Sequence, residues 1–239
     1  MRGETRTIRR VQSHAGESVI GQHDQSGAHP EIRSAPPSLG RILAAVALAT
    51  GALAAALVAA PDAARAQKTA TVILVPGAGG AVASDFLMRN RSALEARGIT
   101  TVVAQGNVAG AVARAQRPVV VVGMSRGTLA AAAGAARADG LVLVSGPLMP
   151  GPAPRSVQAA AGSPAALPPT LIIHNPNDAC QSTPASGVGP FQAWARKAQV
   201  VWVNSGPGRG NPCGPFAAHG FAGNDGSAVS AIARFILSR

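Results

Sequence analysis

A five-residue turn between a strand-like run and a helix-like run constrains this chain more than any other feature. Residues 119–122 are four consecutive valines, typical of a strand buried on both faces, and residues 128–137 are rich in alanine. Between them stands Gly123-Met124-Ser125-Arg126-Gly127. The two glycines allow a turn tight enough to present the serine hydroxyl at the start of a helix. An ordinary turn with a capping serine is the alternative, but the flanking strand and helix together favour Ser125 as a nucleophile.

Strand-like and helix-like runs alternate along residues 67–239. We expect strands at 71–75, 100–104, 119–122, 141–144, 171–174 and 200–203. We expect helices at 84–97, with Ser84 as its cap, and at 108–115, 125–137, 191–198 and 227–237. This order predicts an α/β fold in which about six mostly parallel strands form a sheet with helices on both faces. Ligands of such sheets bind beyond the carboxyl ends of the strands.

A serine nucleophile needs a base, and residues 67–239 offer two histidines. His174 ends an apolar strand, where a buried and hydrogen-bonded structural histidine is the usual outcome. His219 lies in a glycine-rich loop after the last strand, from which it can reach back over the edge of the sheet. We therefore predict that His219 is the base.

Five acidic residues are available to orient that base, and their places relative to the strands distinguish the candidates. Asp139 precedes its strand and so belongs to the wrong end of the sheet, and Asp225 is expected to cap the last helix. Asp178 comes just after the fifth strand, where a carboxylate can orient the imidazole and stabilise its cation.

The resulting order of Ser125, Asp178 and His219 is that of the α/β-hydrolase triad, and the chain resembles this family over essentially all of residues 67–239. More narrowly it resembles a group of small exported bacterial α/β-hydrolases of mostly unassigned substrate. The resemblance depends on residues 86–91 (FLMRNR), 123–128 (GMSRGT), 178–180 (DAC) and 219–221 (HGF).

The resemblance implies an oxyanion hole made of backbone amides. Carried over by position, these are the amides of Arg126 and of Ala78 or Gly79. The chain departs from the larger family because it lacks the antiparallel strands that usually come first and has no large lid. Its only long connection, residues 145–169, is too small for a helical cap domain. We expect a minimal α/β-hydrolase with an open, shallow active site and without a cofactor or metal.

Two classes of function fit these residues. The first is a serine hydrolase that cleaves a small carboxylic ester through an acyl-enzyme, with an amide or a thioester left open as the substrate. The second is a catalytically silent, hydrolase-like exported binding protein. Arg126 could bind a substrate carboxylate, or one of Arg126, Arg89 and Arg91 could brace the loops around the turn through hydrogen bonds to backbone carbonyls, which is the commoner role.

Cys180 follows Asp178 by two residues, and Cys213 precedes His219 by six. A disulfide between them would join the acid loop to the base loop, and an oxidising compartment favours pairing over two buried thiols.

Export is predicted by an apolar run at residues 42–60, preceded by Arg41 and followed by Ala64 and Ala66. These are the parts of a signal peptide with cleavage after Ala66, at the end of a 42–66 signal region. An uncleaved membrane anchor is the alternative. Residues 1–41 are polar and predicted to be disordered, and either an extended leader or a translation start placed too far upstream explains them. The domain at 67–239 would then be periplasmic or secreted.

The net charge of +11 raises the question of nucleic acid, but the 21 basic residues are scattered and the chain has no tyrosine. We therefore expect no nucleic-acid partner. The expected partner is a small ester-like molecule, and we expect the protein to be a monomer.

Overall fold

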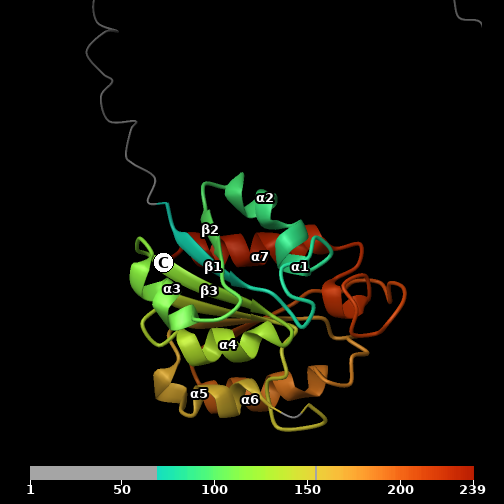
Figure 1. Ribbon diagram of the computed structural model, residues 1–239. Helices are drawn as coiled ribbons and strands as arrows, with labels where there is room; N and C mark the ends of the chain where they lie inside the picture. The colour runs from blue at the N-terminus through green and yellow to red at the C-terminus, as the bar shows by residue number, and fades with distance from the viewer. Residues whose placement is uncertain (1–68, 154) are drawn as a thin grey trace, which may run out of the picture. The chain divides into compact units, whose positions relative to one another are not determined.

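The computed structural model describes residues 69–153 and 155–239, which are built on one central sheet (Figure 1). Its strands are β1 (Thr71–Val75), β2 (Thr100–Val103), β3 (Val119–Met124), β4 (Gly140–Val144), β5 (Thr170–His174) and β6 (Ala198–Trp202). Their spatial order is β2-β1-β3-β4-β5-β6, and all five neighbouring pairs are parallel. The predicted α/β fold class is confirmed, since six parallel strands form one sheet with helices on both faces.

Helices cover both faces of the sheet, as Figure 1 shows. One face carries α1 (Phe86–Arg89), α2 (Arg91–Glu95) and α7 (Asp225–Leu237). The other carries α3 (Val108–Arg114), α4 (Gly127–Gly134), α5 (Val157–Ala161) and α6 (Val188–Ala195). Each face has its own apolar core, because side chains alternate along every strand. The four central strands are buried on both sides and appear in the sequence as continuous apolar runs, whereas the edge strands β2 and β6 are partly exposed.

The first predicted helix is wrong in two respects. It is divided into α1 and α2 at Asn90, and its cap is Asp85 rather than Ser84. The Asp85 carboxylate accepts hydrogen bonds from the amides of Leu87 and Met88, so it satisfies donors that the helix itself cannot pair.

The last helix also begins earlier than predicted, at Asp225, and Asn224 occupies the cap position. Asp225 does not cap the helix, because its carboxylate is bound by Arg89 and Asn90 of the α1–α2 segment. The predicted helix at 125–137 is shortened to Gly127–Gly134, and the one at 191–198 is displaced to Val188–Ala195.

The connection between β4 and β5 contains only α5 and the short 3₁₀ helix η2 (Pro164–Ala166) within its described residues. It therefore holds no cap domain, although α5 packs against α4 and forms part of the wall of a cavity discussed below.

The predicted leader, apolar run and cleavage site at residues 1–66 lie outside the described residues. Within the described part, no helix is both long and apolar enough to cross a membrane.

Candidate active site

Ser125 lies at the carboxyl end of the central strand β3, in a turn that only glycines permit. The backbone of Ser125 has a φ of 50°, a left-handed conformation that non-glycine residues rarely adopt. A Cβ on Gly123 would lie 2.7 Å from the Cα of Thr128, and one on Gly127 would overlap the carbonyl oxygens of Val75 and Pro76. The turn therefore stores strain at Ser125 and holds its side chain above the sheet.

Asp178 and His219 meet at the same end of the sheet, although 41 residues separate them. Nδ1 of His219 lies 2.9 Å from Oδ2 of Asp178, and both side chains are buried. The other carboxylate oxygen, Oδ1, accepts a hydrogen bond from the amide of Cys180 at 2.9 Å. With Nδ1 bound to the carboxylate, Nε2 is the ring nitrogen left for proton transfer.

Thr183 is a member of this cluster that sequence reasoning missed. Its buried hydroxyl lies 3.1 Å from Oδ2 of Asp178 and 3.1 Å from Nδ1 of His219. A threonine in a loop carries no motif, so only its proximity to both groups in space identifies it.

The backbone around His219 is held by hydrogen bonds from three distant elements. Ser145, at the end of β4, donates its hydroxyl to the carbonyl of His219 at 2.9 Å. Asn175, after β5, donates to the carbonyl of Ala218 at 3.1 Å, and Arg89 of α1 donates to that of Gly220 at 2.6 Å. These bonds fix the 3₁₀ turn η4 (Ala218–Gly220) that carries the histidine.

Of the three candidate arginines, Arg89 has the predicted bracing role. Besides Gly220 it binds the carbonyl of Ser84 and the carboxylate of Asp225, so it joins α1, α7 and the histidine turn. Arg91 pairs with Glu95 on its own helix. Arg126 is exposed, and its guanidinium group forms no hydrogen bond or ion pair with any residue that the structure describes.

The predicted disulfide is present, with an S–S distance of 2.00 Å between Cys180 and Cys213. It covalently joins the loop of Asp178 to the loop of His219. The amide that binds Asp178 belongs to Cys180 itself, so the bridge is anchored directly beside the buried acid–base pair.

The loop after β1 brings backbone amides close to the serine. A Cβ on Gly77 would lie 3.4 Å from the Cβ of Ser125, and the amide of Gly77 is bound by Asp85 at 2.9 Å. The amides of Ala78, Gly79 and Arg126 donate no hydrogen bond within the described residues. Ala78 and Arg126 line the same cavity as Ser125.

Ser125 opens into a cavity of about 1060 Å³, at the upper end of the range for small-molecule sites. Its wall is built from the loop after β1, the exposed side of α4, the connection around α5 and the disulfide. The residues that line it include Ala78, Ser125, Arg126, Arg155, Thr183 and Cys180. His219 is buried behind this wall, and its Nε2 has no hydrogen-bond partner among the described residues. The structure therefore brings the three predicted residues to one end of the sheet without a Ser125–His219 hydrogen bond.

His174 has the structural place that the sequence predicts. It is completely buried at the end of β5, with Nδ1 3.1 Å from the carbonyl of Asn175. Burial lowers the pKa of His174 because the charged form loses its hydration. Asp139 lies at the opposite end of the strands, where it binds the amide of Val119.

No protein-family model matches the chain, and no curated protein does so either. Similar solved structures include a predicted CIB-like hydrolase from Thermoplasma acidophilum, with 14% identity, 73% of this chain and 89% of that chain covered, and a TM-score of 0.49. Butyrate-bound esterase 2 from Thermogutta terrifontis has 16% identity, with 72% and 84% covered and a TM-score of 0.46. An acetyl ester-xyloside bifunctional hydrolase from Caldicellulosiruptor lactoaceticus has 15% identity, with 59% and 74% covered and a TM-score of 0.43. These values are too low to transfer an activity to this chain.

Proposed function

We propose that this chain is an exported serine hydrolase that cleaves small carboxylic esters through an acyl-enzyme. The observation that carries the proposal is the buried Asp178–His219 pair at the same sheet end as Ser125, whose strained turn faces a cavity. Nε2 of His219 has no hydrogen-bond partner among the described residues, as is also true of His174, and at the position of His219 this leaves the atom available to accept the serine proton.

The reaction follows from these positions. Oγ of Ser125 attacks the ester carbonyl while its proton passes to Nε2 of His219, and Asp178 stabilises the resulting imidazolium. The negative oxygen of the tetrahedral intermediate is bound by the amides of Arg126 and of Ala78 or Gly79. His219 then protonates the leaving alcohol, which departs and leaves an acyl group on Ser125. Water, deprotonated by His219, attacks this acyl group and releases the acid and the original serine.

The first step requires a Ser125–His219 hydrogen bond that the present geometry does not contain. Catalytic hydrogen bonds commonly tighten only when substrate is bound, and a serine changes rotamer at low cost. We propose that substrate in the cavity completes this contact.

Labelling with a fluorophosphonate tests the serine directly. The protein from Gln67 onward should be labelled stoichiometrically at Ser125, and Ser125→Ala should not react. His219→Gln should slow labelling by several orders of magnitude while the fold, followed by circular dichroism, is retained. A folded wild-type protein that stays unlabelled would contradict the proposal. A panel of short-chain 4-nitrophenyl esters, together with the matching anilides and thioesters, then shows which type of bond the protein cleaves.

A second candidate function is that of a catalytically silent binding protein with the same architecture. The lack of a Ser125–His219 hydrogen bond in the structure favours this alternative. Such a protein would bind small esters at equilibrium without turning them over. Ester binding to wild type with no loss of ester over hours would establish it.

Export is a separate part of the proposal. The Cys180–Cys213 bond supports it, because disulfides persist mainly in oxidising compartments. Expression of the full chain should release a protein that begins at Gln67, identified by N-terminal sequencing of the periplasmic or secreted fraction. A full-length product in the membrane fraction would indicate the uncleaved anchor instead.

A further inference from the structure

The charge lining the Ser125 cavity is entirely positive. Arg126 and Arg155 are its only ionisable side chains among the described residues, and no carboxylate lines it. Residues 67–239 contain only five carboxylate side chains. The partners that these five side chains bind explain why none of them lines the cavity.

Each of the five carboxylates is engaged by another partner, and none of them lines the cavity. Asp85 binds the amides of Gly77, Leu87 and Met88, Glu95 pairs with Arg91, Asp139 with Arg117, Asp178 with His219, and Asp225 with Arg89. No carboxylate of the described domain is therefore available to neutralise Arg126 or Arg155. An anion entering the cavity would meet two guanidinium groups without having to displace an internal partner.

Arg126 and Arg155 lie at the N-terminal ends of α4 and α5, two helices that form part of the cavity wall. Arg126 directly precedes α4, and Arg155 directly precedes Ser156, the cap of α5. Both are exposed. The same two helices also contribute small apolar side chains to the cavity wall, Ala130 and Ala133 on α4 and Ala159 and Ala160 on α5. A short hydrocarbon chain fits this wall, and a guanidinium group binds a carboxylate through two parallel hydrogen bonds.

We propose that the cavity selects esters that carry a carboxylate a few carbons away from the scissile bond, with Arg126 and Arg155 binding that carboxylate. The inference depends on the proposed ester hydrolysis and names its substrate class. Half-esters of short dicarboxylic acids are the simplest members of this class.

The kinetic test compares two activated esters of equal chain length, mono-4-nitrophenyl adipate and its methyl-blocked diester, whose chain is long enough that the free carboxylate does not readily expel nitrophenolate by forming a cyclic anhydride. Wild type should have a kcat/KM at least about tenfold higher for the anionic ester, because each charge-assisted pair is stronger than a neutral hydrogen bond. Arg126→Gln and Arg155→Gln should each lower the ratio of the two kcat/KM values by about tenfold. The ratio should also fall as salt rises, since the two arginines are exposed.

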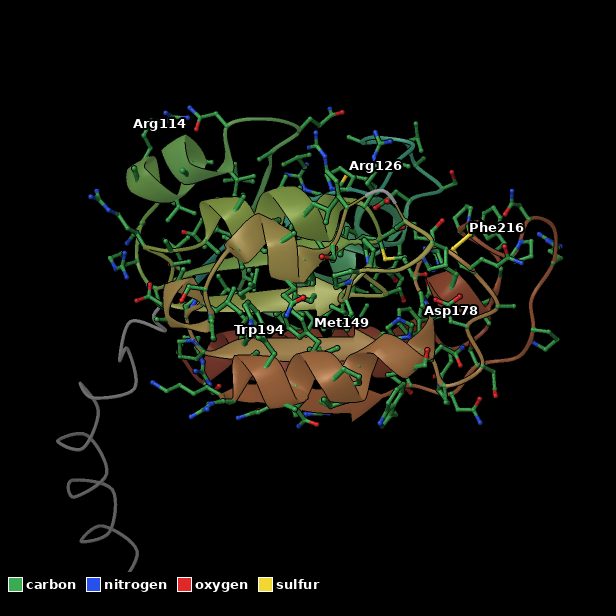
Figure 2. The ribbon with its side chains drawn as sticks, turned by 90° about the horizontal axis from the view of Figure 1, so that it is seen from below. Arg114, Arg126, Met149, Asp178, Trp194 and Phe216 are labelled. Atoms are coloured by element: carbon green, nitrogen blue, oxygen red, sulfur yellow. A yellow bond between two sulfur atoms is a disulfide. The ribbon has the colours of Figure 1, made fainter. Side chains whose placement is uncertain are left out.

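Arg114 provides the matched control. It is an exposed arginine on α3, and Figure 2 shows it at the end of the sheet away from Arg126 and Asp178. Arg114→Gln lowers the net charge by the same amount but should leave the ratio unchanged. A preference for the blocked diester, or a preference for the anionic ester that survives in the Arg126→Gln/Arg155→Gln double variant, would overturn the inference.

A binding measurement separates failure of the inference from failure of the proposed function. Ser125→Ala should bind monomethyl succinate at least about tenfold more tightly than dimethyl succinate by calorimetry, and the double arginine variant should lose this difference. If binding discriminates but wild type hydrolyses neither ester, the hydrolase proposal fails and the anion site remains. If esters are hydrolysed but the two succinates bind equally, the anion site is wrong and the hydrolase proposal remains.

Discussion

The turn that carries Ser125 and the loops that carry Asp178 and His219 are held in place in different ways. The turn at Ser125 depends on two glycines within two residues of the serine, which let α4 pack closely against the end of β1. The loops of Asp178 and His219 are held by a disulfide and by hydrogen bonds from β4, β5 and α1. Ser125 is thus positioned by glycines next to it in sequence and by close backbone packing, whereas Asp178 and His219 depend on a disulfide and side-chain hydrogen bonds between distant segments.

The largest expected effect comes from the acid. Asp178→Asn should keep the geometry but favour the wrong tautomer of His219, so kcat for ester hydrolysis should fall by about 10⁴. The matched control is Asp139→Asn at the other end of the sheet, which should retain kcat. Comparable rates in the two variants would remove Asp178 from the mechanism.

Removal of the disulfide should weaken the acid and base loops most. The loop closed by the bond spans 33 residues, for which chain entropy gives about 3–4 kcal/mol of stability. Urea denaturation of the Cys180→Ser/Cys213→Ser variant should show this loss, and reduction of wild type should reproduce it. Activity should fall further than the unfolded fraction explains. If reduction changes neither stability nor rate, the loops are held without the bond.

Gly127→Ala tests the local turn. The new Cβ would meet the backbone of Val75 and Pro76, which cannot move aside as a flexible side chain could, so we expect about 1–3 kcal/mol of destabilisation and loss of fluorophosphonate labelling. Gly226→Ala in α7 is the control because nothing lies within 4 Å of its Cβ. That variant should gain about 0.5–1 kcal/mol from helix propensity. Equal behaviour of the two alanines would show that the turn tolerates a side chain.

Thr183→Val should reduce kcat by about tenfold, because a buried hydrogen-bond donor to the acid–base pair is lost. Thr183→Ser retains the hydroxyl and should restore most of the rate. Since Thr183 also lines the cavity, KM is measured for both variants. A serine variant as slow as the valine variant would assign Thr183 to packing alone.

The smallest effect concerns His174, next to the acid loop. Burial lowers its pKa below the usual 6.5, so the folded protein holds it neutral while the unfolded chain binds a proton more readily. Stability should therefore be full above pH 6.5 and decrease as the pH falls from there toward the lowered value. In His174→Gln, the slope of unfolding free energy against pH should be shallower in this window. Identical slopes would mean that the buried ring does not contribute to acid sensitivity.

The helix boundaries show where sequence reasoning was least complete. The central strands β1, β3, β4 and β5 are buried on both faces and appear in the sequence as continuous apolar runs. The edge strands β2 and β6 are partly exposed, yet all six strands were found to within about two residues. The division of the first helix at Asn90 and the binding of Asp225 by Arg89 were not found, because both depend on α1 and α7 packing together. Propensity alone assigns Asp225 to a cap, and tertiary contacts override it.

The sequence by itself determined the α/β class, the strained turn at Ser125 and the small set of residues from which an acid and a base could come. Periodicity, glycine placement and scarcity of ionisable residues are all local or compositional properties. Only the tertiary structure decided that Thr183, Ser145 and Arg89 hold the histidine region, and that Arg126 and Arg155 share a cavity without a carboxylate. These relations join residues far apart in the chain, and side-chain distances of a few ångströms between such residues are set by packing of the whole domain.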